Sequence, residues 1–135
     1  PDGIFYNASS KTAEYAISVV AQHATISLSA PVISTITSDP SNPVAVAQWT
    51  AVLKDAKGNE ISSNKPEVTY SIDDGTHFDV TPGTGEVKLK ANVAAGSYQL
   101  TVTATAVNNG DYYTFGTAGT DNVKNSTVTI VVVNP

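Results

Sequence analysis

Strict alternation of apolar and polar residues is the feature that most constrains this chain. Over residues 98–106, Tyr98, Leu100, Val102 and Ala104 occupy every second position, and Gln or Thr stands between them. Successive side chains of a β-strand point to opposite faces of the sheet. The pattern therefore predicts a strand with one buried face and one face in water.

Three further segments, 67–72, 86–90 and 127–133, show the same period of two. Their predicted inward residues are Val68, Tyr70, Ile72, Val87, Leu89, Val128, Ile130 and Val132. Turn-forming residues separate the segments at 55–59, 73–75, 82–85 and 108–110, where Gly, Asn and Asp tolerate the backbone angles of tight turns. Short strands at such spacing favour a sandwich of two sheets.

Composition agrees with an all-β fold. The chain has 17 Thr, 17 Val, 16 Ala and 13 Ser among its 135 residues, so nearly half of it is small and neutral, and much of that half is β-branched. Branching at Cβ favours strands over helices. Since no stretch carries a sustained helical period, we expect less than about one-tenth helix.

Charge and length exclude several classes of protein. There is no Cys, hence no disulfide and no thiolate metal site, and there is no Arg in a chain of net charge -5, so we expect no nucleic-acid partner. The longest apolar run, 130–133, is far short of the roughly 20 residues that cross a bilayer, so we expect no membrane insertion. A chain of 135 residues is the size of one domain.

The first 30 residues predict a hairpin, with strands at 14–20 and 24–30 that end at Pro31. Two interpretations remain open. Residues 1–30 can be the tail of a preceding repeat, with Pro31 and Pro135 at equivalent junctions of a tandem array, or an extension of one sheet of the domain formed by residues 31–135.

Residues 49–61 run from an apolar segment through Asp55-Ala56-Lys57-Gly58-Asn59, and an alternating segment follows at 67–72. This arrangement resembles the second and third strands of bacterial immunoglobulin-like repeats. Residues 85–89, 96–102 and 127–133 resemble the later strands of the same family. The resemblance implies an immunoglobulin-like antiparallel β-sandwich of about seven strands, with the hairpin as an addition.

Repeats of this family occur in bacterial surface-layer proteins and adhesins. The resemblance therefore implies a structural, non-catalytic spacer outside the cell, at the bacterial cell surface. Its implied partners are neighbouring repeats or subunits of the same protein, with a glycan or a host protein as further possibilities. Two alternatives are a carbohydrate-binding module that uses Tyr112, Tyr113 and Trp49, and a viral decoration domain with the same core pattern.

Three residues are expected to hold such a sandwich together. Trp49 is the largest candidate for the core, because the chain has a single Trp. Leu100 stands where antibody domains carry a cysteine. Tyr98, two positions earlier, stands where a tyrosine corner would tie the phenol hydroxyl to nearby backbone.

The candidates for chemistry begin with the two histidines. His77 lies close in sequence to Asp73, Asp74 and Asp79, a set of residue types that can bind a divalent metal. The alternative is that Asp73 and Asp74 only form a turn. We expect His23, between two strands, to be a surface or turn residue. Because neither histidine belongs to a catalytic motif, we expect no enzymatic activity.

Oxygen ligands for calcium are abundant in the predicted loops. They are Asp39, Asp55, Asn59, Asp73, Asp111, Asp121 and Asn122. We expect that the protein requires no cofactor. A structural calcium ion is the metal ion that these loops could hold. The alternative is that the acids cap and solvate turns.

The longest irregular segment, 107–122, contains Asp111, Tyr112, Tyr113 and Phe115. A loop of this length is often a binding site. Aromatic rings beside Asp and Asn can bind a sugar or a partner protein. The alternative is that Tyr113 and Phe115 pack onto the open end of the sandwich.

Overall fold

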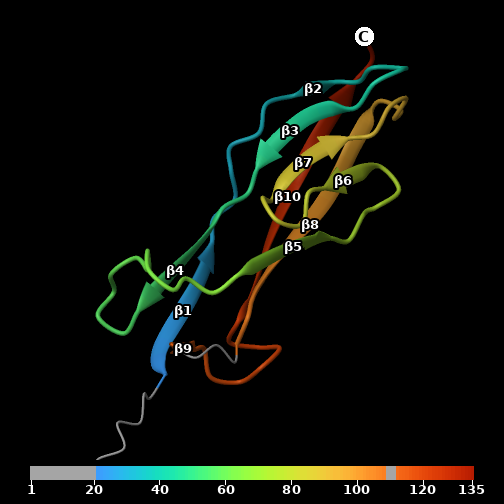
Figure 1. Cartoon of the computed structure of the whole chain (residues 1–135). Helices are drawn as coiled ribbons and strands as arrows, with labels where there is room; N and C mark the ends of the chain where they lie inside the picture. The colour runs from blue at the N-terminus through green and yellow to red at the C-terminus, as the bar shows by residue number, and fades with distance from the viewer. Residues whose placement is uncertain (1–20, 109–111) are drawn as a thin grey trace, which may run out of the picture.

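A computed structural model describes residues 21–108 and 112–135 (Figure 1). These residues form ten strands and no helix, and so contain no helix that could span a membrane. The strands are β1 (Gln22–Leu28), β2 (Ile36–Thr37), β3 (Val44–Gln48), β4 (Ala51–Asp55), β5 (Val68–Ile72), β6 (Phe78–Val80), β7 (Glu86–Leu89), β8 (Gly96–Ala106), β9 (Tyr113–Thr114) and β10 (Val123–Val133). The predicted all-β class and low helix content are confirmed.

The strands are hydrogen-bonded in three groups. One sheet has the order β2-β10-β8-β5, the second β4-β1-β9 and the third β3-β7-β6. β8 and β10 form the longest pair, antiparallel over ten residue pairs without a register shift. β3 and β4 follow each other along the chain with only Trp49 and Thr50 between them, so the second and third groups share one line of backbone.

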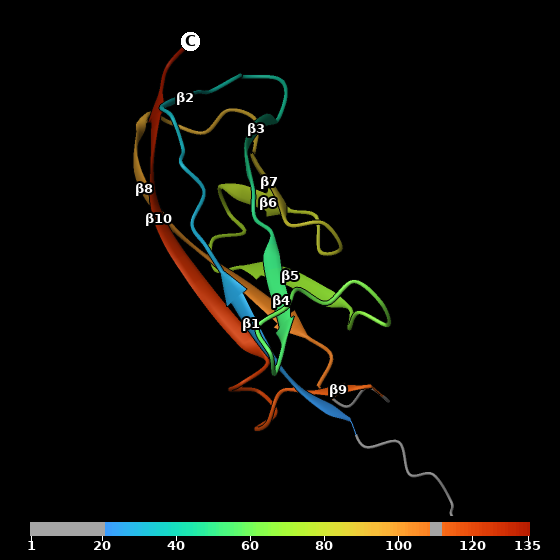
Figure 2. The same cartoon turned by 90° about the vertical axis from the view of Figure 1, so that its left-hand side faces the viewer.

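One hydrophobic core collects side chains from all of these groups. Its largest fully buried members are Trp49, Phe78, Phe115, Leu53, Leu89, Leu100 and Ile130. Figure 2 shows β8 and β10 side by side along one flank of the molecule, with β3, β6 and β7 across from them. The apolar faces of the sheets therefore cover each other, which is the favourable arrangement for strands with one apolar face.

The alternating segments form the strands that their periodicity predicts. In β8 the inward side chains of Leu100, Val102 and Ala104 are fully buried, and Tyr98 is half-buried. The predicted inward residues of β5, β7 and β10 are buried or half-buried as well. Because burial at alternate positions is set by strand geometry, these faces are confirmed.

Two expectations about the fold are wrong. Two of the three sheets are mixed, because β2 pairs with β10 and β9 pairs with β1 in parallel. The third, β3-β7-β6, is antiparallel as expected. There are ten strands among the described residues instead of about seven, since loops contribute the two-residue strands β2 and β9 and the line of β3 and β4 breaks at Trp49.

The predicted N-terminal hairpin is described only in its second half. Residues 14–20 lie outside the described part of the chain. β1 occupies most of the second predicted strand, pairs antiparallel with β4 and buries Ala24 and Ile26 in the core. His23 lies within β1 and not in a turn, but it is exposed, as expected of a surface histidine.

Gly85 shows how closely the line of β3 and β4 fits against its neighbours. Its φ of 80° is in the left-handed region, and a Cβ atom there would collide with the Trp49 carbonyl oxygen and lie 3.1 Å from the Tyr70 ring. The Trp49 amide donates to the Gly85 carbonyl at 2.9 Å. Glycine is therefore required at this close approach of two backbone segments.

Candidate functional site

Asp74 and His77 form the closest polar side-chain pair among the predicted metal ligands. His77 Nδ1 lies 2.8 Å from Asp74 Oδ2, and Asp74 Oδ1 accepts hydrogen bonds from the backbone amides of Thr76 and His77, each at 3.1 Å. The His77 ring packs against Tyr98 with 4.6 Å between ring centroids. The carboxylate therefore closes the turn and orients the imidazole.

Opposing effects act on the pKa of Asp74. Partial burial raises it, but the hydrogen bonds from the His77 side chain and amide, the His77 charge and the Thr76 amide together hold the pKa below its ordinary value. Asp74 is therefore ionised at neutral pH.

The other two predicted ligands point elsewhere. Asp73 Oδ1 accepts a hydrogen bond from the Thr101 amide at 2.9 Å, which ties the loop to β8. Asp79 lies on β6 beside the Lys90 ammonium, with 3.9 Å from Oδ1 to Nζ. Across residues 21–108 and 112–135, no three His, Asp or Glu side chains gather as a metal site would require.

Several of the loop residues that were candidates for calcium form hydrogen bonds with nearby backbone amides. Asp55 Oδ1 accepts from the amides of Lys57 and Asn59 at 2.9 and 3.0 Å, and Asp121 Oδ2 accepts from Thr117 at 2.7 Å. The buried Asn122 side chain bonds the backbone of Gly119 and Ala106. This is the local capping that makes Asp and Asn common in turns.

Asp39 follows the same pattern. Its Oδ1 accepts from the amides of Ser41 and Asn42 at 2.7 and 3.1 Å. These hydrogen bonds stabilise the charged form, so the pKa of Asp39 lies below its ordinary value.

The aromatic residues of segment 107–122 separate between core and surface. Phe115 is fully buried, Tyr113 is half-buried against the core and Tyr112 is 51% exposed. Asp111, the fourth predicted binding residue, lies outside the described residues. Asn108 Oδ1 accepts from the Phe115 amide at 2.7 Å, which fixes the loop while the phenyl ring fills the end of the core.

The three predicted structural residues lie as follows. Trp49 has no exposed surface, and its indole Nε1 donates to Ser126 Oγ on β10 at 3.2 Å. Leu100 is fully buried. The Tyr98 hydroxyl donates to the Ala94 carbonyl at 2.6 Å, four residues upstream. Trp49 is thus unavailable as a surface platform for a sugar.

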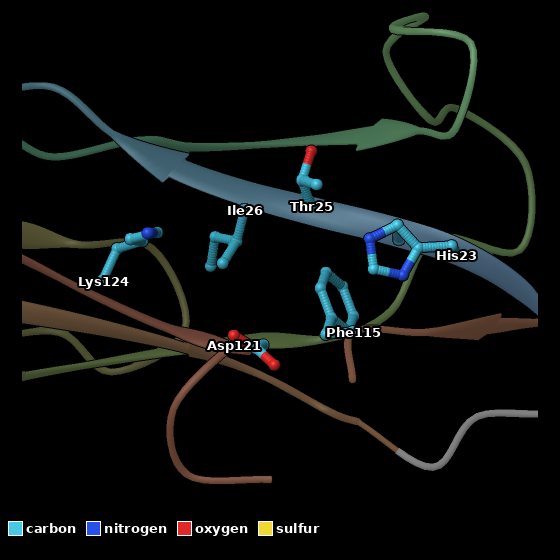
Figure 3. Close-up of a pocket in the computed structure, with 7 residues that line it drawn as sticks. His23, Thr25, Ile26, Phe115, Asp121 and Lys124 are labelled. Carbon is cyan, nitrogen blue, oxygen red and sulfur yellow. The ribbon is translucent and has the colours of Figure 1, made fainter. Parts of the chain in front are cut away.

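A pocket of about 240 Å³ opens between β1, the loop that carries Phe115, and the start of β10 (Figure 3). Its lining residues are His23, Ala24, Thr25, Ile26, Phe115, Asp121 and Lys124. Figure 3 shows Asp121 and Lys124 on the side of the pocket across from β1. The pocket is thus lined by residues of β1, by the Phe115 ring and by two side chains of opposite charge, Asp121 and Lys124.

No sequence pattern predicts this pocket. His23 and Asp121 are almost 100 residues apart, and nothing local indicates that β1 runs beside the start of β10. The nearest signal was the long loop 107–122, which contributes Phe115 and Asp121.

The chain matches no known protein family and no curated protein.

Proposed function

We propose that this chain is an immunoglobulin-like sandwich that serves as a non-catalytic, rigid spacer in a surface-layer protein or adhesin outside a bacterial cell. The observation that carries the proposal is the path of the chain. The described chain enters at one end of the molecule, at the start of β1, and leaves at the opposite end, after β10 (Figure 1). A domain with this path lengthens a polypeptide in one direction.

The strand order supports the sandwich. If β3 and β4 count as one strand, β1, β3/β4, β7 and β6 form one layer and β2, β10, β8 and β5 form the other. In an immunoglobulin constant-type domain, the first, second, fifth and fourth strands face the third, sixth and seventh. The chain follows that order when β2 is taken as a continuation of the first strand beside the last.

The pairing of the terminal strands supports mechanical rigidity. β2 pairs in parallel with the end of β10, where the Ser38 amide donates to the Val133 carbonyl at 3.0 Å. β1 pairs with β4 over five residue pairs. Tension applied along the chain loads both strands lengthwise, so their hydrogen bonds resist together in shear instead of opening one by one.

Single-molecule stretching of a polyprotein that contains the chain tests this proposal. We expect one cooperative unfolding event, with a gain in length approaching about 400 Å for the described segment at roughly 3.6 Å per residue. Extension without a force peak, or in several small steps, would contradict a rigid spacer. Ser38→Pro removes the amide donor to β10 and is expected to lower the unfolding force, whereas Ser41→Ala, which keeps its amide, is the control.

The proposed location has a test of its own. An antibody raised against the folded chain should label intact cells of the organism that makes it, without permeabilisation. Labelling only after permeabilisation would refute an extracellular role while leaving the spacer geometry untouched.

The spacer requires no cofactor, and a calcium ion in its loops is a separate proposal. Specific binding to the folded state would raise the melting temperature in excess calcium relative to chelator. An unchanged melting temperature would leave the loop carboxylates with their capping role alone.

A further inference from the structure

One edge of β10 is covered by another strand only at its end. β10 pairs with β8 over residues 123–132, and on its other side β2 reaches only Val132 and Val133 (Figure 2). In the described part of the chain, no segment other than β2 and the adjoining Ser38 makes a backbone hydrogen bond to this side of β10. Residues 123–131 therefore form a sheet edge.

Backbone groups of alternate β10 residues point to this edge. The Ala106 amide donates to the Asn122 carbonyl, so Asn122 and every second residue after it bond to β8. Since backbone groups alternate along an antiparallel strand, Asn125, Thr127 and Thr129 direct their amides and carbonyls outward. All three residues are exposed, so the edge lies at the surface, where a second strand can reach it.

The edge has little of the protection that keeps sheet edges apart. Proteins guard exposed edges with charged residues, proline or bulges. β10 contains no proline, pairs with β8 without a register shift, and carries one charged residue, Lys124, next to its beginning. A long and regular edge of this kind favours pairing with a strand of another chain.

The distribution of charge makes this sheet the place where two copies of the chain can meet. A net charge of -5 makes the copies repel each other. The sheet formed by β2, β10, β8 and β5 contains no acidic residue, and Lys124 is its only charged residue. Contact along β10 therefore brings no carboxylates of this sheet together.

We propose that two copies of this chain join edge to edge through β10, antiparallel about a two-fold axis at Ser126. Residues 123–129 of the two copies then face each other and stop short of Val132, where β2 begins. A two-fold axis lets the same surface serve both copies. The contact goes beyond the proposed spacer role and does not depend on it, because it joins two chains side by side.

The outer side chains of β10 fit this arrangement. The axis places Asn125 opposite the partner's Thr127, and Thr127 opposite the partner's Asn125. β10 already pairs the same residue types with β8: Thr103 Oγ1 donates to Asn125 Oδ1 at 2.9 Å, and the hydroxyl oxygens of Thr101 and Thr127 lie 2.8 Å apart. Hydrogen-bonded cross-strand pairs stabilise sheets, so the dimer extends a row of polar pairs that the sheet already has.

The geometry sets the strength of the contact. The pairing forms about eight backbone hydrogen bonds, two for each residue pair that faces the edge. A single pair of strands buries less than the roughly 1,200 Å² of a stable interface. We therefore expect a dissociation constant of about 0.1–1 mM. Added salt should tighten the association, because it screens the repulsion between the acidic copies.

The test is amide hydrogen exchange of the whole chain by NMR at about 20 μM and about 2 mM, concentrations below and above that dissociation constant. The amides of Asn125, Thr127 and Thr129 should exchange fast in dilute solution and about threefold more slowly in concentrated solution. The amides of Ser126 and Val128 bond to β8 and should be slow in both, which makes them internal controls.

Three results would overturn the proposal. The first is a monomer at both concentrations in sedimentation equilibrium. The second is association that leaves exchange at Asn125, Thr127 and Thr129 unchanged, because the copies would then meet elsewhere. The third is slow exchange of these amides already in dilute solution, because another part of the same chain would then cover the edge.

Variants of β10 locate the contact. Thr127→Pro removes an outward amide, which an edge strand tolerates, and should weaken association at least about tenfold. Thr127→Lys brings two like charges together near the axis and should weaken it at least about threefold. Thr105→Lys makes the same change of charge on the exposed face of β8, an interior strand, and should associate as the parent does. Equal weakening by the two lysine variants would refute the assignment, and these two decide if Thr127→Pro fails to fold.

Discussion

The contact between Trp49 and Ser126 joins the line of β3 and β4 to β10, so its removal gives a sharp test of the packing. Trp49 has no exposed surface and Ser126 is 7% exposed. Trp49→Ala should lower the free energy of unfolding by about 3–5 kcal/mol, the usual cost of deleting a buried aromatic side chain. This is a large part of the roughly 5–15 kcal/mol that stabilises a typical domain.

The hydrogen bond itself can be separated from the packing. Ser126→Ala leaves the buried indole N–H without an acceptor and should cost about 1–3 kcal/mol. Trp49→Phe leaves the Ser126 hydroxyl without its donor and also removes ring volume. In the double variant no unpaired partner of that bond remains, so the two single costs should exceed the double cost by about 1 kcal/mol.

Urea denaturation followed by circular dichroism measures the parent and the four variants without relying on the tryptophan signal. For a domain of this size, each kcal/mol corresponds to a fall of about 3–4 °C in melting temperature, so Trp49→Ala should melt at least about 10 °C below the parent. The reasoning is refuted if Trp49→Ala costs less than about 1 kcal/mol, or if the parent's tryptophan emission is that of a water-exposed indole.

Three further predictions follow from local contacts. Asp74→Asn should lose about 1 kcal/mol above pH 4. The folded-state pKa of Asp74 is lowered, so the stabilisation by its carboxylate is fully present above the unfolded-state pKa and is lost as the pH falls through the folded-state pKa. The free energies of unfolding of the two proteins, measured in urea, should therefore converge in acid. Gly85→Ala should cost about 2 kcal/mol or more in urea denaturation, since it combines a left-handed φ with a collision. Gly83→Ala, where an added Cβ meets nothing within 4 Å, should be close to neutral, and equal costs would contradict the assigned geometry. Tyr98→Phe should lower the free energy of unfolding by about 1 kcal/mol, because it removes the hydrogen bond of the hydroxyl. An unchanged melting temperature would show that this bond does not stabilise the fold.

The strand faces were predictable because their signal is local. Alternation at Leu100, Val102 and Ala104 depends only on the two-residue period of a strand, and the structure buries all three. Turn chemistry is local as well, and Asp55 bonds the amides of its own turn. Short-range geometry thus accounts for most of the elements.

The partners of those strands were not predictable, because they depend on distant contacts. Nothing near β1 in sequence indicates that Ala24 lies opposite Asp55 or that Gln22 pairs with Tyr113. The two parallel pairs, and the pocket beside the pair of β1 and β9, follow from such contacts.

The acidic cluster around His77 illustrates the same limit at a site. Four ligand-type residues lie within seven positions, but Asp73 bonds Thr101 on β8 and Asp79 lies beside Lys90. Only Asp74 stays with the imidazole. Closeness in sequence therefore predicted the residue types of a metal site without predicting where their side chains point.

Cross-strand nuclear Overhauser effects between backbone protons test the central claim, the immunoglobulin-like order of the strands, most directly. The account predicts contacts between Ile36 and Val132 in a parallel pair, and between Ala24 and Asp55 in an antiparallel one. Contacts that place β2 beside β4, or β1 beside β8, would contradict the strand order and with it the path of the chain on which the spacer proposal rests.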